Sequence, residues 1–157
     1  GTRVNEPKAY KLYFNIGLDY STTNTLRIAE AYIEGVGLNK DTPQGIKLLK
    51  KAEKDGNEEA AYQLGNLYKW GIDIRRNYKK AFEYFNITAS SKTPNLQHFH
   101  LQSFLELGKC YYYGDGINQD HKKAQTWFKK AYNQKDYDNI KEEAQVWLED
   151  YLGLEIK

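Results

Sequence analysis

The sequence has 157 residues, of which 40% are hydrophobic and 28% are charged, and its formal net charge is +2. This composition supplies enough apolar side chains for a core and excludes global disorder. The near-neutral charge gives no general electrostatic drive towards nucleic acid or an anionic membrane. The single cysteine, Cys110, excludes an internal disulfide and a zinc site built from several thiolates.

The ends and the hydropathy of the chain say little about its compartment. No apolar run approaches the roughly 18 residues of a membrane span, so we expect no direct membrane insertion. The N-terminus does not resemble a signal peptide. The chain starts with Gly-Thr-Arg and contains no methionine. We therefore expect a fragment or a processed chain, part of a longer multi-domain protein from which a targeting segment could have been removed.

A turn motif recurs along the chain and organises it into repeats. The motif is two glycines, or glycine and aspartate, followed by an Asp or Asn: Gly35-Val-Gly37 with Asp41, Gly71-Ile-Asp73 with Asn77, and Gly114-Asp-Gly116 with Asp120. The first two copies are 36 residues apart and the last two are 43 apart. The seven extra residues fit the polar, proline-containing stretch around residues 91–95.

The predicted elements follow in chain order within a single repeat domain, residues 1–157. Residues 5–20 form the second half of an upstream unit, 22–56 unit one, 57–90 unit two, and 91–95 an insertion. Residues 96–134 form unit three, and 139–152 form a closing helix. Each full unit contains two helices, so we expect about eight helices in all.

The first helix of each unit carries small or apolar residues at intervals of three and four, which places them on one face. These residues are Thr25, Ile28, Ala29 and Tyr32; Ala61, Leu64, Gly65 and Tyr68; Phe104, Leu107, Gly108 and Tyr111; and, in the closing helix, Ala144, Trp147, Leu148 and Tyr151. A glycine inside a helix costs about 1 kcal/mol relative to alanine. Its occurrence at the same place twice indicates close packing of a neighbouring helix.

The second helix of each unit begins after an Asp or Asn that can cap it. A small, a large and a small residue then mark its core face: Ala81, Tyr84 and Thr88, matched by Ala124, Trp127 and Ala131. A helical pair of this size cannot bury its apolar face alone, so neighbouring units must stack.

Unit three carries the fullest pattern: Leu107-Gly108, Tyr111, Gly114, Gly116, Asp120, Lys123-Ala124, Trp127 and Lys130-Ala131. This pattern resembles the Sel-one-like repeat family, which is related to the tetratricopeptide repeats. Unit two departs from it at Asp73 and Thr88, and unit one at Gly45 and Leu48. The resemblance implies an all-α, right-handed α-solenoid. It also implies an adaptor that assembles protein complexes, although a minority of the family is associated with peptidoglycan-like or β-lactam ligands.

The loop around Gly114 and Gly116 could instead bind a cation or a phosphate. A calcium loop needs oxygen ligands at alternate positions. Counting from Asp115, these positions hold Ile117 and Gln119, so the set of oxygen ligands is incomplete. The Lys-Ser/Thr of a phosphate-binding loop is missing. We therefore interpret the loop as a turn between helices, with Asp120 as the cap of the next helix.

Other chemically capable residues have simpler interpretations. His98 and His100 point to nearly opposite sides of a helix, so we expect polar surface histidines rather than a metal site. Cys110 has no base or orienting group assigned to it, so we expect a semi-buried packing thiol. Two sets of lysines lie on second helices, where we expect a solvated face rather than a nucleic-acid site: Lys47, Lys50, Lys51 and Lys54, and Lys122, Lys123, Lys129 and Lys130.

The candidate binding residues lie beside the core face of the first helices. This stripe mixes aromatic, aliphatic and charged residues, as interfaces often do: Tyr62, Asn66 and Lys69; Leu105, Lys109 and Tyr112; and Leu26, Glu30 and Ile33. The alternative is that Leu26, Ile33 and Leu105 pack against adjacent repeats.

The sequence predicts no catalytic, cofactor-binding or metal-binding residue and no nucleic-acid partner. We expect a non-catalytic scaffold that binds a protein or peptide in the concave groove of the solenoid. The alternative is a protein that binds or hydrolyses a small ligand or a cell-wall fragment such as peptidoglycan or a β-lactam. That function requires a pocket with convergent acids or with a nucleophile and base.

Overall fold

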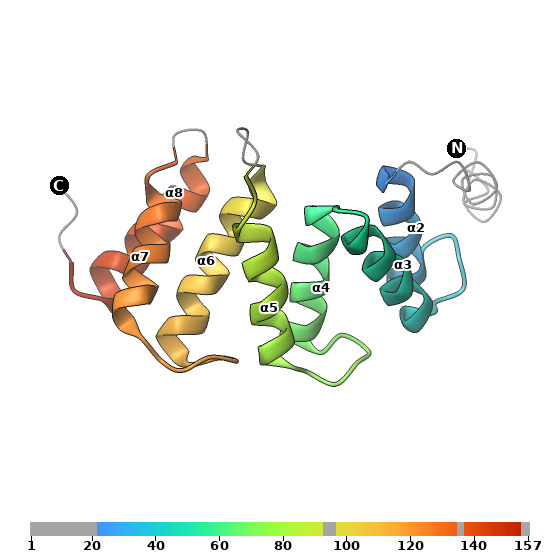
Figure 1. Ribbon diagram of the computed structural model, residues 1–157, viewed down its shortest axis with the longest axis horizontal. Helices are drawn as coiled ribbons and strands as arrows, with labels where there is room; N and C mark the ends of the chain where they lie inside the picture. Colours follow the sequence, from blue (N-terminus) through green and yellow to red (C-terminus); the bar gives the residue numbers. More distant parts are fainter. Residues whose placement is uncertain (1–21, 93–96, 135–136, 155–157) are drawn as a thin grey trace, which may run out of the picture. The chain divides into compact units, whose positions relative to one another are not determined.

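The computed structural model describes residues 22–92, 97–134 and 137–154 (Figure 1). These residues form seven α-helices and one π-helical turn, and they contain no β-strand. The predicted all-α helical repeat fold is therefore confirmed. The helix predicted for residues 5–20 and most of the predicted insertion at 91–95 lie outside the described residues. The chain divides into two compact units, residues 1–64 and 65–157, and the boundary falls within a helix.

The described part of the first compact unit holds α2 (Thr22–Glu34), α3 (Thr42–Lys54) and the first half of α4 (Glu58–Trp70). Helix α2 packs against α3. Ala29 and Leu49, one from each helix, have no exposed surface. The close contact comes from Gly45, where a Cβ atom would lie 2.6 Å from Cγ1 of Ile33 and 2.7 Å from the carbonyl oxygen of Ala29.

The second compact unit holds the rest of α4, α5 (Tyr78–Ala89), α6 (His98–Tyr113), α7 (His121–Tyr132), α8 (Asp138–Val146) and the π-helical turn η1 (Trp147–Tyr151). Helix α6 contacts α5, α7 and α8, so it lies at the centre of this unit. The repeat boundaries given above stay a prediction.

The predicted helix caps are confirmed. The side chains of Asp41, Asn77 and Asp120 each accept a hydrogen bond from the backbone N–H three residues later, at 3.0 Å. The same three residues donate their backbone N–H to the carbonyls of Tyr32, Tyr68 and Tyr111, at 2.8 to 2.9 Å. The backbone N–H of Lys123 lowers the pKa of Asp120 from its ordinary value, because it stabilises the charged carboxylate. Three turns of different sequence thus share one geometry.

The turn glycines adopt the left-handed backbone conformation that side chains disfavour. Gly114 has φ +81° and Gly116 has φ +77°. In unit two the place of the second glycine is taken by Asp73, which has φ +52°. Aspartate tolerates this region better than most residues, so the departure in sequence leaves the backbone conformation in place.

The large buried residue of each second helix lies one position beyond the predicted one. Phe85 and Phe128 have no exposed surface, and neither has Leu49 at the equivalent place in unit one. The predicted large residues Tyr84 and Trp127 are half-buried. The small residues Ala81, Thr88, Ala124 and Ala131 are buried as expected.

The closing helix differs from its prediction at one end. Ala144, Trp147 and Leu148 are buried, but Tyr151 is 51% exposed. The last turn is π-helical, and a π-helical turn contains more residues than an α-helical one. Tyr151 is thereby rotated off the buried face that a regular α-helix would give it.

Candidate partner-binding site

The structure divides the predicted stripe into buried and accessible residues. Leu105 has no exposed surface and Leu26 is 5% exposed, so both belong to the core, as the packing alternative states. The other stripe residues are half-buried: Glu30 and Ile33 on α2, Tyr62, Asn66 and Lys69 on α4, and Lys109 and Tyr112 on α6.

In the first compact unit, stripe residues also join helices to one another. Glu30 on α2 accepts a hydrogen bond from Nε2 of Gln63 on α4, at 2.6 Å. Ile33 faces Gly45 of α3 at the close helix contact described above. Both side chains are therefore held in place by neighbouring helices.

In the second compact unit, an ion-pair network joins three helices beside the stripe. Glu106 of α6 is 9% exposed in its side chain and pairs with Lys69 of α4 and, at 3.1 Å, with Lys109. Lys109 also pairs with Glu143 of α8, at 2.7 Å. Burial of the Lys109 ammonium opposes its charged form, but Glu106 and Glu143 outweigh this and raise the pKa of Lys109 above its ordinary value.

Sequence reasoning missed Glu106 and Glu143. The repeat period carried a signal for Glu106. This residue lies 43 residues after Gln63, the interval between repeat units two and three, and so takes the same place in the next repeat unit. Both side chains bond to a residue on the first helix of the preceding unit, Glu30 in one case and Lys69 in the other.

Tyr112 belongs to a cluster of rings at the C-terminal end of the second compact unit. Its ring is stacked on His121 with centroids 4.8 Å apart, and it meets the edge of Trp147 at 5.4 Å. Trp147 is in turn stacked on Tyr151, at 4.4 Å, and on Phe128, at 5.1 Å. Tyr113, also against Trp147, is 57% exposed. The cluster thus combines a fixed tyrosine with exposed aromatic surface.

The other chemically capable residues have structural roles. Among the described residues, no group of three or more His, Cys, Asp or Glu side chains could hold a metal ion. His98 is exposed as predicted, but the prediction was wrong for His100, which is 1% exposed. Its Nδ1 accepts the backbone N–H of Gln97 at the start of α6. This helix-capping role lets the imidazole be buried with a polar partner.

Cys110 is buried, and burial raises the pKa of its thiol to about 12. Since the thiolate is the reactive form, roughly one molecule in ten thousand carries it at pH 8. We expect a thiol reagent such as dithionitrobenzoate to label the folded protein far more slowly than the urea-unfolded protein. Labelling as fast as that of free cysteine would contradict this burial.

Charge is separated between the two kinds of helix. The second helices α3, α5 and α7 carry net charges of +3, +1 and +4, whereas α2, α4 and α6 carry −1, −1 and 0. Helix α8 with η1 carries −4. The near-neutral total of the chain therefore conceals basic second helices.

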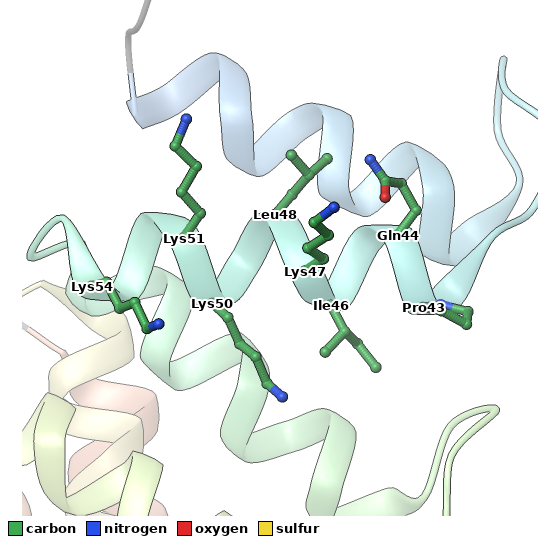
Figure 2. Close-up of a pocket in the computed structure, with 8 residues that line it drawn as sticks. All are labelled: Pro43, Gln44, Ile46, Lys47, Leu48, Lys50, Lys51 and Lys54. Carbon is green, nitrogen blue, oxygen red and sulfur yellow. The ribbon is translucent and has the colours of Figure 1, made fainter.

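The basic face of α3 borders an open depression of about 690 Å³. Figure 2 shows Lys47 and Lys51 projecting from one side of the helix in this view, as Leu48 does, and Lys50 and Lys54 from the other side, as Ile46 does. No helix of the described residues is long and apolar enough to cross a membrane.

Helix pairs of one design, repeated with equivalent caps and turns, define a helical repeat protein of the solenoid class. A model of the Sel1 repeat matches residues 26–57, 58–92 and 105–136, which together make up more than half of the sequence. The chain therefore belongs to the Sel1 repeat family. Proteins of this family are generally non-catalytic scaffolds, and their repeats typically mediate protein interactions.

Two solved structures show the same fold. A Sel1 repeat protein from Oxalobacter formigenes superposes with a TM-score of 0.75 at 21% identity, over 94% of this chain and 56% of its own. The protein c5321, a protective antigen present in uropathogenic Escherichia coli strains and displaying an SLR fold, gives 0.76 at 22% identity, over 94% of this chain and 30% of its own. This chain thus spans only part of either protein. No curated protein matches the sequence.

Proposed function

We propose that this chain is a protein-interaction scaffold that binds a protein or peptide partner along the first-helix stripe. The observation that carries the proposal is that Lys69, Lys109 and Tyr112 are accessible and yet fixed in position. Each is partly accessible, and each is held by ion pairs or ring contacts to a neighbouring helix. A surface that is already ordered loses little conformational entropy when a partner binds.

The composition of the accessible stripe supports a protein or peptide as the ligand. Tyr62 and Tyr112 offer large rings with a polar tip, and tyrosine is enriched at the energetic centres of interfaces. Lys69 and Lys109 keep 20% and 23% of their side-chain surface exposed while they are ion-paired. They can therefore donate to acceptors on a partner without leaving a carboxylate unpaired.

We expect the double variant Tyr62→Ala/Tyr112→Ala to lose the partners that the wild-type chain retains. The test is affinity capture on the immobilised chain, read by quantitative mass spectrometry and followed by titration calorimetry with each captured protein. Loss of the two rings is expected to weaken binding about 10-fold or more, since interface tyrosines often contribute over 1 kcal/mol each.

The matched control removes two exposed side chains from second helices, Glu83→Ala/Thr126→Ala, and is expected to retain every partner. Circular dichroism melting shows whether both variants fold. A folded stripe variant that keeps all partners would refute the proposal. An unfolded one would place the two tyrosines in the core and remove them from the binding site.

A further inference from the structure

Helix α3 presents a basic surface outside the predicted stripe. Pro43, Lys47, Lys50 and Lys54 recur at intervals of four, three and four, which places them on one helix face. All but Lys50, which is half-buried, are exposed. These residues line the open depression on the helix, and the exposed Pro43 gives the surface an apolar component beside its lysines (Figure 2).

Helix α8 and the turn η1 present an acidic surface of similar design. Asp138, Glu142, Val146 and Asp150 recur every four residues, and all four are exposed. Val146 is 46% exposed and Tyr151, beside Asp150, is 51% exposed. An acidic row is thus interrupted by apolar side chains that nothing in the described part of the chain covers fully.

We propose that these two surfaces bind each other between copies of this chain, the acidic α8–η1 surface of one copy on the basic α3 surface of the next. Three exposed carboxylates, Asp138, Glu142 and Asp150, face the three lysines Lys47, Lys50 and Lys54 in this arrangement. Complementary charge steers the encounter and sets the register, and apolar contact with Val146 and Tyr151 supplies part of the affinity.

The contact is heterologous, because two different surfaces of the chain meet. Each surface lies within one compact unit, so the proposal does not depend on how the units are arranged within a copy. It is independent of the proposed stripe, whose residues it leaves unused. Exposed charge pairs contribute little individually, so the association is weak and sensitive to salt.

The test is sedimentation velocity of the full chain over a range of concentrations. The wild type is expected to exceed the monomer mass at about 50 mM salt and to return to it at about 500 mM, where charges are screened within a few ångströms. Two charge-reversed variants isolate the surfaces: Lys47→Glu/Lys54→Glu for α3 and Glu142→Lys/Asp150→Lys for α8–η1. Each alone is expected to weaken self-association at least 10-fold.

An equimolar mixture of the two variants is the decisive sample. The unreversed α8–η1 surface of the first variant can bind the unreversed α3 surface of the second, and the two reversed surfaces are also complementary in charge, so the mixture is expected to recover the salt-sensitive association that each variant alone has lost. The matched control, Lys122→Glu/Lys129→Glu, makes the same charge change at the same seven-residue spacing on α7. It is expected to associate like the wild type.

Three results would overturn the proposal. The first is a wild type that stays monomeric at low salt up to its solubility limit. The second is a mixture that does not associate although circular dichroism shows both variants folded. The third is a control that loses association as fully as the α3 variant does, which would show a general effect of charge. A basic surface that binds only acidic proteins or nucleic acid would appear as the first result.

Discussion

Replacing Gly116 by alanine is expected to lower the free energy of unfolding by about 2–5 kcal/mol. Gly116 has φ +77°, where a residue with a Cβ atom costs about 1–2 kcal/mol more than glycine. The new Cβ would also meet the backbone at the start of α5, with the carbonyl carbon of Tyr78 at 2.5 Å and the nitrogen of Lys79 at 2.6 Å. Backbone atoms cannot move aside as a side-chain tip can, and overpacking typically costs a further 1–3 kcal/mol.

Gly56→Ala is the matched control, because it separates the two costs. Gly56 has φ +89°, and a Cβ atom at this position would meet nothing within 4 Å. Its variant is therefore expected to lose only the 1–2 kcal/mol of backbone strain. Urea unfolding followed by circular dichroism measures both losses. A Gly116 variant no less stable than the Gly56 variant would show that the turn does not press on α5.

The local features of this fold are the ones that the sequence predicts well. Asp41, Asn77 and Asp120 act as caps because capping requires only a short polar side chain and the next three residues. The turn with Gly114 and Gly116 is likewise determined by residues close together in the sequence. Because these caps and turns recur at matched intervals, they indicate the helical pairs and the family.

The buried polar residues that were missed depend on specific partners in the folded chain. Glu106 carries a charge, which normally predicts exposure, yet Lys69 and Lys109 from neighbouring turns and helices let it be buried. His100 is buried because of the Gln97 N–H, a partner supplied by the start of its own helix. Such burial cannot be deduced from the polarity of the residue itself.

The candidate site stays a prediction, and the sequence indicates the accessibility of its residues only in part. Its helix faces follow from spacing, but spacing alone does not separate Leu105, which is fully buried, from Lys109, which is accessible. The exposed position of Tyr151 was also missed. Its cause is the π-helical turn, which carries no recognised signal in these residues.

The effect of Gly108→Ala is expected to change sign with the residue at position 128. A Cβ atom at Gly108 would lie 2.7 Å from Cδ1 and Cζ of the Phe128 ring. That ring is fully buried and stacked on Trp147, so it has little room to withdraw. In the wild type we therefore expect a net loss of stability of about 1–2 kcal/mol, since overpacking outweighs the gain in helix propensity.

In a Phe128→Ala background the ring is gone, and the same change at Gly108 is expected to stabilise the protein by about 1 kcal/mol through helix propensity. Phe128→Ala alone is expected to cost about 3–5 kcal/mol. Urea unfolding of the four proteins gives the coupling energy directly.

Gly65 and Phe85 repeat the arrangement, with Cε1 of the ring 2.6 Å from a Cβ at Gly65, and are expected to couple with the same sign. Unit one has Ala29 and Leu49 at these places, which is consistent with glycine being required only where the second helix supplies a phenylalanine ring. A loss of stability for Gly108→Ala in both backgrounds would show that the glycine serves another contact.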